Sequence, residues 1–283
     1  MTIHEKLEYA VRHFGMDIQQ GRQIREDFIE IDGIKIPRFV QPAAEHEMDY
    51  SLFDIVLSSV LRRKPESFDG FYEAIEPFFN EGPYEYGEVS IEKGDIVFDC
   101  GANIGLFSAV ASRYGAHVHA FEAIPGTIDD YLSKTAAWNK HIAIYNNAVW
   151  DEKKMLDFSV DENHIGAARC DELLGNGTPV SQRHKVQAIT LDAFVEERQL
   201  ERVDFIKADI EGAERNLLRG AKNVLKRFAP KLSICSYHLH DDPQVLQELI
   251  LKANPNYVIT QKYSKIYAYV PLNPVGTTGT QEE

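Results

Sequence analysis

Cysteine is scarce in this sequence, which contains only Cys100, Cys170 and Cys235. An odd number of widely spaced cysteines provides neither a disulfide framework nor the paired spacing of a zinc site. No apolar run reaches the ~18 residues that a membrane-spanning helix needs. The first residues also lack the basic region and apolar region of a secretory signal. We therefore expect a cytoplasmic protein in which Cys100 and Cys235 are small buried residues.

Positive charge is also in deficit, because 30 Lys and Arg residues face 44 Asp and Glu residues, a net charge of -14 over 283 residues. A chain this acidic has no overall attraction for nucleic acid or for an anionic membrane, and we expect neither as a partner. Its 44% hydrophobic and 26% charged residues are typical of a globular protein. The length favours one catalytic-size domain with an appendage.

The pattern of the chain changes near residue 90. Before that point, apolar residues at helical spacing predict helices over 2–14 and 47–63. Between them, two short apolar runs around an Asp-Gly pair predict a hairpin over 28–37, because Asp-Gly accommodates a tight turn. We expect residues 1–83 to form a helical and hairpin cap, which serves either as a structural cover or as a lid over a neighbouring site.

After residue 90, strand-like and helix-like segments alternate, which indicates crossover units and a largely parallel sheet in an α/β domain. The expected strands are 95–99, 117–121, 142–147, 203–208, 231–237, 257–262 and 266–271. The expected helices are 104–114, 126–139, 191–199, 213–227 with a break at Gly220, and 243–253. Two further β-like runs, 154–160 and 184–190, flank a polar insertion at 161–182. Residues 274–283 are polar, and we expect a disordered tail there.

The strongest local signal is the turn that joins the first of these strands to its helix. There Gly101 and Gly105 let the backbone turn sharply, and Asn103 lies between them. Glu122, at the end of the next strand, is placed to accept hydrogen bonds from a ribose diol. Asp99 would repel a phosphate and suits a cationic ligand such as S-adenosylmethionine. The alternative is a purely structural turn with a capping aspartate.

Several motifs together resemble a known enzyme family. DIVFDCGANIGLFS looks like motif I of class I S-adenosylmethionine-dependent methyltransferases. Its combination with FEAIP, NNAVWD, DFIKADIEGAE and the pair Tyr237-His238 resembles the FkbM family. The resemblance covers about residues 84–271. It implies a Rossmann-like domain over 84–273, with a seven-stranded mostly parallel sheet, an antiparallel last strand and helices on both faces.

The same resemblance implies S-adenosylmethionine as the cofactor. The residues it implies for cofactor binding are Asp99, Gly101, Asn103, Gly105 and Glu122, with Ala148 and Val149 beside the adenine. Trp150 could also border the adenine or simply pack against the sheet.

O-methylation is the chemistry that the family implies, and it needs a group that takes a proton from the acceptor hydroxyl. In such a sheet the first, fourth and fifth strands are neighbours, so their carboxyl ends bring Asp209, Glu211 and His238 to one cleft. His238 and Asp209 are the leading candidates for the base. The same three residues offer oxygen and nitrogen ligands for Mg²⁺ or Mn²⁺, which remains an open alternative.

For each of the other residues near these strand ends, the sequence allows a functional and a structural interpretation. Lys207 should face the same side as Asp209, and it could pair with Asp209 or with Asp99, in a catalytic or a structural role. Glu214 and Glu211 could be acids of a helix's first turn, favoured by the helix dipole. His238 itself could be a hydrogen-bonded core residue.

Acceptor contacts are the least constrained part of the prediction. Tyr84 and Tyr86 precede the first core strand and could line the acceptor site or serve in packing. His240 could contact the acceptor or lie in a loop. In the insertion, Arg169 could touch the acceptor or be solvated.

We therefore expect a methyltransferase that acts on a hydroxyl of a small molecule, such as a sugar or a secondary metabolite. A protein or peptide side chain is the alternative acceptor. A non-catalytic nucleotide-binding module and a nicotinamide oxidoreductase are rivals from other classes. Base N-methylation of nucleic acid is disfavoured. Enzymes of that type carry a motif similar to Asn-Pro-Pro-Tyr after the fourth strand, and this chain has Asp209-Ile-Glu-Gly212 there.

Overall fold

The computed structural model describes residues 23–25, 27–31, 33–38, 40–42, 47–49, 83–160, 168–173 and 182–271. The expected helix over 2–14 and the tail at 274–283 lie outside the described residues. The expected helix over 47–63 is wrong at its start, because β5 (Glu47–Asp49) pairs antiparallel with β4 (Val40–Pro42). Pairing with a neighbouring segment satisfies the backbone groups there, and helical spacing of side chains cannot reveal it. Residues 50–63 lie outside the described residues.

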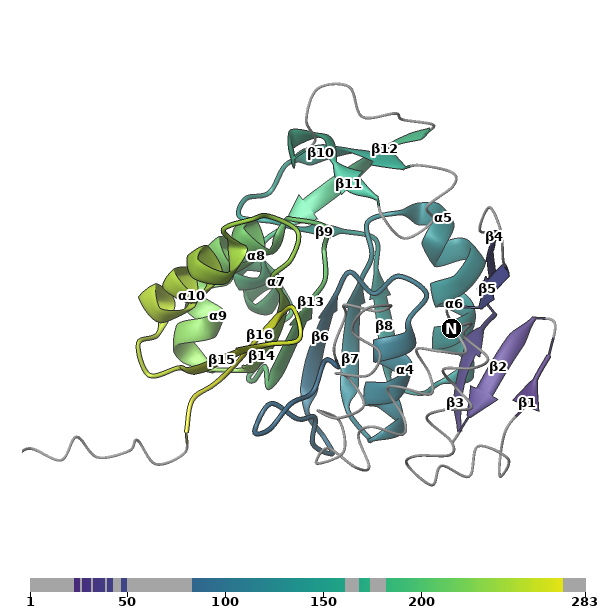
Figure 1. Cartoon of the computed structure of the whole chain (residues 1–283), viewed down its shortest axis with the longest axis horizontal. Helices are drawn as coiled ribbons and strands as arrows, with labels where there is room; N and C mark the ends of the chain where they lie inside the picture. The colour runs from purple at the N-terminus through teal and green to yellow at the C-terminus, as the bar shows by residue number, and fades with distance from the viewer. Residues whose placement is uncertain are drawn as a thin grey trace, which may run out of the picture.

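Seven strands form the central sheet in the order β15-β16-β14-β13-β6-β7-β8 (Figure 1). Their bounds are β6 (Ile96–Cys100), β7 (His117–Phe121), β8 (Ile142–Tyr145), β13 (Phe205–Ala208), β14 (Lys231–Cys235), β15 (Val258–Lys262) and β16 (Lys265–Tyr269). The strands from β14 to β8 pair in parallel, whereas β16 runs antiparallel to both of its neighbours. This confirms the seven-stranded, mostly parallel sheet with an antiparallel last strand.

Helices cover both faces of this sheet, as predicted (Figure 1). The helical segments are α4 (Leu106–Arg113), α5 (Pro125–Thr127), the π-helical η3 (Ile128–Leu132), α6 (Ser133–Trp138), α7 (Leu191–Glu197), α8 (Glu214–Gly220), α9 (Lys222–Arg227) and α10 (Asp242–Ala253). Successive strand side chains point to opposite faces. Val97 therefore packs in the core with Phe107 of α4, and Phe98 packs in the core with Phe194 of α7.

The helix expected over 213–227 breaks where the sequence indicated. Gly220 lies so close to the main chain of Trp150 that an added Cβ would be 2.1 Å from its carbonyl oxygen. The glycine permits this contact, and α8 ends there before α9 begins at Lys222. Trp150 is buried and packs in the core.

A second, smaller sheet has the strand order β11-β10-β12-β9. It consists of β9 (Ala148–Val149), β10 (Met155–Val160), β11 (Arg169–Cys170) and β12 (Gln182–Ile189), and it contains both predicted β-like runs. Leu156 and Phe158 of this sheet belong to one apolar cluster with Ala213, and Ile210 packs against that cluster. The sheet therefore supports the loop that follows β13.

The predicted hairpin is formed by β2 (Phe28–Ile31) and β3 (Ile34–Pro37), and β1 (Gln23–Ile24) pairs with β2. Ile29, Ile34 and Ile36 are fully buried in the core that contains α4. The Asn139 side chain donates a 2.7 Å hydrogen bond to the Lys35 carbonyl. The hairpin thus packs against α4 and α6, and a lid role for residues 1–83 stays a prediction.

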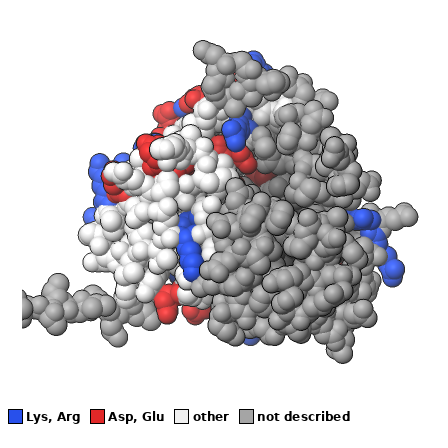
Figure 2. All heavy atoms as spheres, in the orientation of Figure 1, with Lys and Arg blue, Asp and Glu red and all other residues white. Residues whose placement is uncertain are grey.

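Charged groups of both signs are interspersed on the described part of the surface in Figure 2. All three cysteines are free and buried. Within the described residues, no helix combines the length and the apolar character needed to cross a membrane.

Candidate active site

The turn after β6 is built around residues with positive φ. Gly101 has φ 78° and Gly105 has φ 87°, and Asn103 has φ 48°. A Cβ on Gly101 would lie 1.9 Å from the carbonyl oxygen of Asp209, and one on Gly105 would lie 2.8 Å from the Thr135 Cγ2 atom. The two glycines are therefore required by contacts within the protein, and Gly101 brings this turn against the loop after β13.

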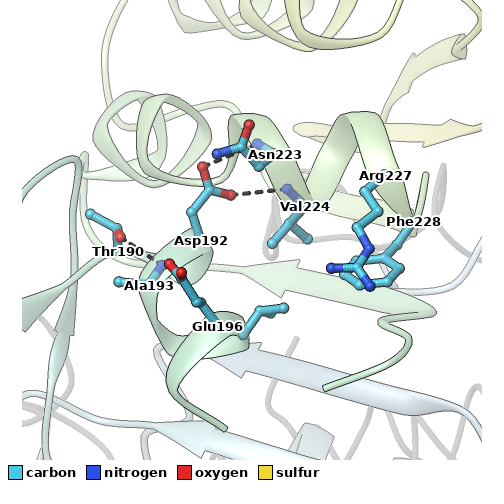
Figure 3. A pocket seen from close by; sticks show the side chains of 9 residues that line it. Thr190, Asp192, Ala193, Glu196, Asn223, Val224, Arg227 and Phe228 are labelled. Carbon is cyan, nitrogen blue, oxygen red and sulfur yellow. Dashed lines mark hydrogen bonds between the residues drawn. The ribbon is translucent and has the colours of Figure 1, made fainter. Parts of the chain in front are cut away.

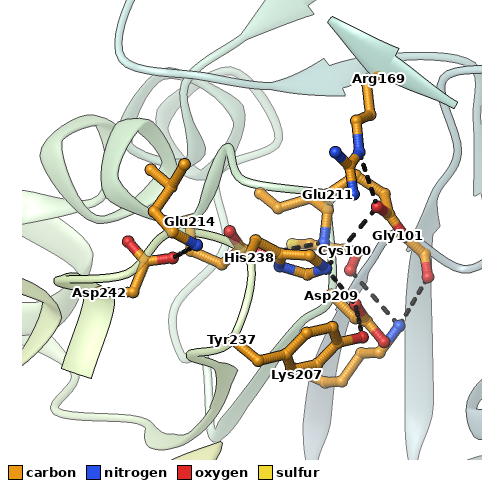
Figure 4. Close-up of polar contacts among 12 residues, drawn as sticks. Cys100, Gly101, Arg169, Lys207, Asp209, Glu211, Glu214, Tyr237, His238 and Asp242 are labelled. Atoms are coloured by element: carbon orange, nitrogen blue, oxygen red, sulfur yellow. Dashed lines mark hydrogen bonds and ion pairs between the residues drawn. The ribbon is translucent and has the colours of Figure 1, made fainter. Parts of the chain in front are cut away.

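Asp99 and Lys207 form a buried ion pair below this turn. Their Oδ1 and Nζ atoms lie 3.1 Å apart, and the Ser108 hydroxyl donates a 2.6 Å hydrogen bond to the other Asp99 oxygen. Lys207 also donates a 2.6 Å hydrogen bond to the Gly101 carbonyl (Figure 4). Of the two pairings that the sequence left open for Lys207, the structure contains the one with Asp99. The charge of Asp99 is thus matched inside the protein.

Glu122 lies at the end of β7 with both carboxylate oxygens engaged. They accept 2.9 Å hydrogen bonds from the backbone N–H groups of Asn103 and Ile124. Burial raises the pKa of Glu122, against the lowering effect of these donors. Within the described part of the chain, the buried Oδ1 atom of Asn103 has no hydrogen-bond partner. The ends of β6 and β7 therefore offer acceptor atoms to a ligand that carries hydroxyl or amino groups.

Asp209, Glu211 and His238 meet at the ends of β13 and β14, as the sequence predicted (Figure 4). The His238 Nε2 atom lies 3.7 Å from Asp209 Oδ1 and 3.8 Å from Glu211 Oε2. The Tyr84 hydroxyl donates a 2.6 Å hydrogen bond to the other Asp209 oxygen. One of the two tyrosines considered for acceptor contacts thus reaches the cluster.

Glu214 approaches the same histidine from the opposite side. It is the first residue of α8 and is fully buried, and its Oε1 atom lies 3.0 Å from His238 Nδ1. Burial alone would lower the pKa of His238, but Glu214, Asp209 and Glu211 outweigh that effect and raise it to about 9. His238 therefore carries a proton on both ring nitrogens at neutral pH.

Asp209 and Glu211, the two partly buried carboxylates on the Nε2 side of His238, differ in basicity. Burial raises the pKa of Glu211, although His238 and the nearby Arg169 guanidinium partly oppose it; the Arg169 Nε atom donates a 3.3 Å hydrogen bond to this carboxylate. Burial would also raise the pKa of Asp209, but the charges of Lys207, Lys265 and His238 bring it below its ordinary value. Glu211 is thus the more basic carboxylate.

Lys265 is a charged residue of this region that the sequence reasoning missed. It is fully buried on β16, opposite Cys235 of β14. Its ammonium group lies 4.6 Å from the centre of the Tyr84 ring, and that of Lys207 lies 5.0 Å from the same ring. The available signal was a lysine that opens the otherwise apolar strand KIYAY.

Asp209, Glu211 and His238, which the sequence offered as ligands of Mg²⁺ or Mn²⁺, lie close together in the structure. One ligand atom from each of Asp209, Glu211 and His238 falls within 4.8 Å of the others. A histidine binds a metal ion only as the neutral imidazole, so an ion would have to displace a proton that the carboxylates favour. Metal assistance therefore stays the alternative that the sequence left open and is not what this geometry favours.

Other predicted site residues lie elsewhere. Tyr86 accepts a 3.2 Å hydrogen bond from Lys262 of β15, and its ring lies tilted at 5.4 Å from that of Tyr267 of β16, so it packs against these two strands. His240 is exposed in the loop before α10. Ala148 and Val149 are buried in β9, where they pair with β12. Their role beside an adenine stays a prediction.

A surface groove of about 460 Å³ lies between α7 and α9, away from this cluster (Figure 3). The Asp192 carboxylate accepts hydrogen bonds from the N–H groups of Asn223 and Val224 there and so caps α9. None of the predicted site residues lines this groove.

The sheet order, the glycine turn after β6 and the acid at the end of β7 define a Rossmann-like methyltransferase fold. Residues 99–259 match the model of the methyltransferase FkbM domain, which covers more than half of the chain. The chain therefore belongs to the FkbM methyltransferase family. It is an S-adenosylmethionine-dependent methyltransferase.

The proteins similar to the chain include two curated relatives and a solved structure. It is 22% identical over 230 residues to 31-O-demethyl-FK506 methyltransferase FkbM of Streptomyces tacrolimicus, covering 71% of this chain and 87% of that protein. It is 25% identical over 170 residues to hexuronic acid methyltransferase AglP of Haloferax volcanii, covering 60% and 67%. A crystal structure of methyltransferase FkbM from Methylobacillus flagellatus KT aligns with TM-score 0.49 and 21% identity. That alignment covers 77% of this chain and 54% of the other, so this chain spans about half of that structure's length.

Proposed function

We propose that this protein transfers a methyl group from S-adenosylmethionine to a hydroxyl of a small molecule, either a sugar or a secondary metabolite. The observation that carries the proposal is the acid–base cluster of Asp209, Glu211 and His238 at the strand ends, beside the turn after β6. A hydroxyl becomes a good nucleophile only when its proton is removed, and such a cluster suits that task. The names of both curated relatives also describe methylation of small molecules.

The protein's own groups divide the work in this proposal. Glu122 and Asn103 hold the cofactor through their side-chain oxygens, which accept hydrogen bonds from the hydroxyl and amino groups of S-adenosylmethionine. When bound, S-adenosylmethionine supplies an electrophilic methyl group on its sulfonium. The Asp99–Lys207 pair holds the turn against the sheet, which fixes the geometry that an in-line displacement needs.

Glu211 is the group that we place closest to the acceptor proton. Its side chain is 22% exposed, whereas that of His238 is 3% exposed. Burial raises the pKa of Glu211, so it is a better base than Asp209. The His238 imidazolium faces both carboxylates and, with Lys207 and Lys265, keeps Asp209 ionised beside this base.

The test is a transfer assay with purified protein and S-adenosylmethionine. The acceptors are glucuronic acid, neutral hexoses, a polyhydroxylated macrolide and a peptide mixture, and mass spectrometry reports which product gains a methyl group. We expect an O-methylated small molecule, and we expect Glu211→Gln to lower turnover by about 10²–10⁴-fold with S-adenosylhomocysteine binding retained. Methylation of peptides alone would replace the proposal with the alternative acceptor class.

A further inference from the structure

Glu214 joins two parts of the candidate site from inside the protein. One of its oxygens accepts a 2.9 Å hydrogen bond from the backbone N–H of Ile210, in the loop between Asp209 and Glu211. The same oxygen lies 3.0 Å from His238 Nδ1 (Figure 4). An acid that merely favoured the helix dipole would not need to be fully buried, as Glu214 is.

The charges that face His238 come from two elements. Glu214 of α8 lies on the Nδ1 side, and Asp209 and Glu211 of the loop after β13 lie on the Nε2 side. The ring of Tyr237 lies 4.2 Å from the imidazole, measured between ring centres. Each ring nitrogen of His238 therefore faces at least one carboxylate.

The cations of the region lie one step further out. Arg169 of β11 contacts Glu211, and Lys207 of β13 and Lys265 of β16 act on Asp209. Arg215 of α8 is paired with Asp242 and Asp241. Lysine and arginine have no acceptor atom, so none of these cations could take the place of Glu214 opposite His238 Nδ1.

We infer that Glu214 is a positioning residue, which fixes the His238 ring with Nδ1–H toward α8 and Nε2 toward the two carboxylates of the candidate site. This inference deepens the proposed function and rests on it for its catalytic meaning. Because Glu214 also binds the Ile210 N–H, it ties the orientation of the histidine to the path of the loop that carries Asp209 and Glu211.

The test compares Glu214→Gln with a matched control, Asp242→Asn. The amide oxygen of glutamine still accepts the Ile210 hydrogen bond, while the charge at His238 is lost. Asp242 is also fully buried, and it accepts a 2.8 Å hydrogen bond from the Leu239 N–H beside His238, but its ion pair is with Arg215. The two variants therefore remove one buried carboxylate each, and only one of them faces the histidine.

The primary readout is an NMR titration of protein labelled with ¹⁵N in its 10 histidines, with the His238 signals assigned from a His238→Gln spectrum. We expect Glu214→Gln to lower the pKa of His238 by about one unit or more, as loss of an adjacent opposite charge does, and Asp242→Asn to leave it in place. An unchanged pKa in Glu214→Gln, or equal shifts in both variants, would overturn the inference.

Two further readouts separate this inference from the proposed function. If Glu214→Gln does not fold, the wild-type spectrum above the His238 pKa decides: the Nδ1–H tautomer supports the inference, and the Nε2–H tautomer overturns it. Once an acceptor is known, the limb of the pH–rate profile that reports His238 should move to lower pH in Glu214→Gln, with the acceptor KM unchanged. The NMR result needs no acceptor, so failure to methylate any small molecule would count against the proposed function alone.

Discussion

The ammonium group of Lys207 lies 3.1 Å from the carboxylate of Asp99, and both side chains are almost wholly buried. This pair connects β13 to β6 directly beneath the glycine turn. Removing one partner of a buried ion pair destabilises a protein more than removing both, because the remaining charge is left uncompensated.

The first prediction concerns this ion pair. Lys207→Met should lower the free energy of unfolding by about 3–5 kcal/mol, because it leaves the Asp99 charge buried and uncompensated. Adding Asp99→Asn to that variant should restore part of the loss, as urea unfolding would measure. Lys153→Met is the control, because Lys153 pairs with Glu197 at the surface and should matter little. Additive effects of the two core substitutions would contradict the prediction.

The second prediction concerns Glu122. Glu122→Ala removes the acceptor for the Asn103 and Ile124 N–H groups and the carboxylate offered to the cofactor. At 100 times its dissociation constant, S-adenosylhomocysteine should stabilise the wild type by ~2.7 kcal/mol, and the variant should lose most of that effect. Calorimetry and thermal unfolding measure both quantities. Glu197→Ala is the surface control, and an undiminished shift in Glu122→Ala would count against a cofactor site here.

The third prediction is a pH dependence of stability. The pKa of His238 is raised from its ordinary 6.5 to about 9 in the folded protein. Its contribution to stability is therefore complete below pH 6.5 and is lost as the pH rises through 9. The free energy of unfolding should fall by about 3 kcal/mol over that range relative to His238→Gln. Guanidinium titrations at several pH values test this, and parallel curves for the two proteins would refute it.

The fourth prediction concerns divalent ions. With His238 protonated, the cluster has its positive charge without a metal, so EDTA should leave the initial rate of methyl transfer unchanged. The measurement is the rate in chelator, then after addition of Mg²⁺ or Mn²⁺. A rate that is lost in EDTA and restored by either ion would establish the metal-assisted alternative.

The sequence was sufficient for the sheet and for part of the site. Short apolar runs and helical spacing placed the strands and helices of the main domain, and the FkbM resemblance supplied their order. The carboxyl ends of neighbouring parallel strands share one edge of the sheet. The strand order therefore also predicted that Asp209, Glu211 and His238 lie together.

The remainder depends on contacts between distant segments. Glu214 occupies a position typical of a first-turn acid, and nothing local indicates that its side chain turns back to His238. Lys265 opens an apolar strand, and its neighbour Tyr84 lies far away in the sequence. Strand β5 depends on its partner β4, which explains why helical spacing misled there.

The contact between Gly101 and the Asp209 carbonyl has a consequence for how this enzyme can change. A side chain at position 101 would collide with the backbone from which the adjacent acids extend. The turn after β6 and the loop after β13 therefore have to change together, although more than 100 residues separate them. A graft that replaced the turn after β6 with a sequence lacking glycine at this position would have to carry a new loop after β13.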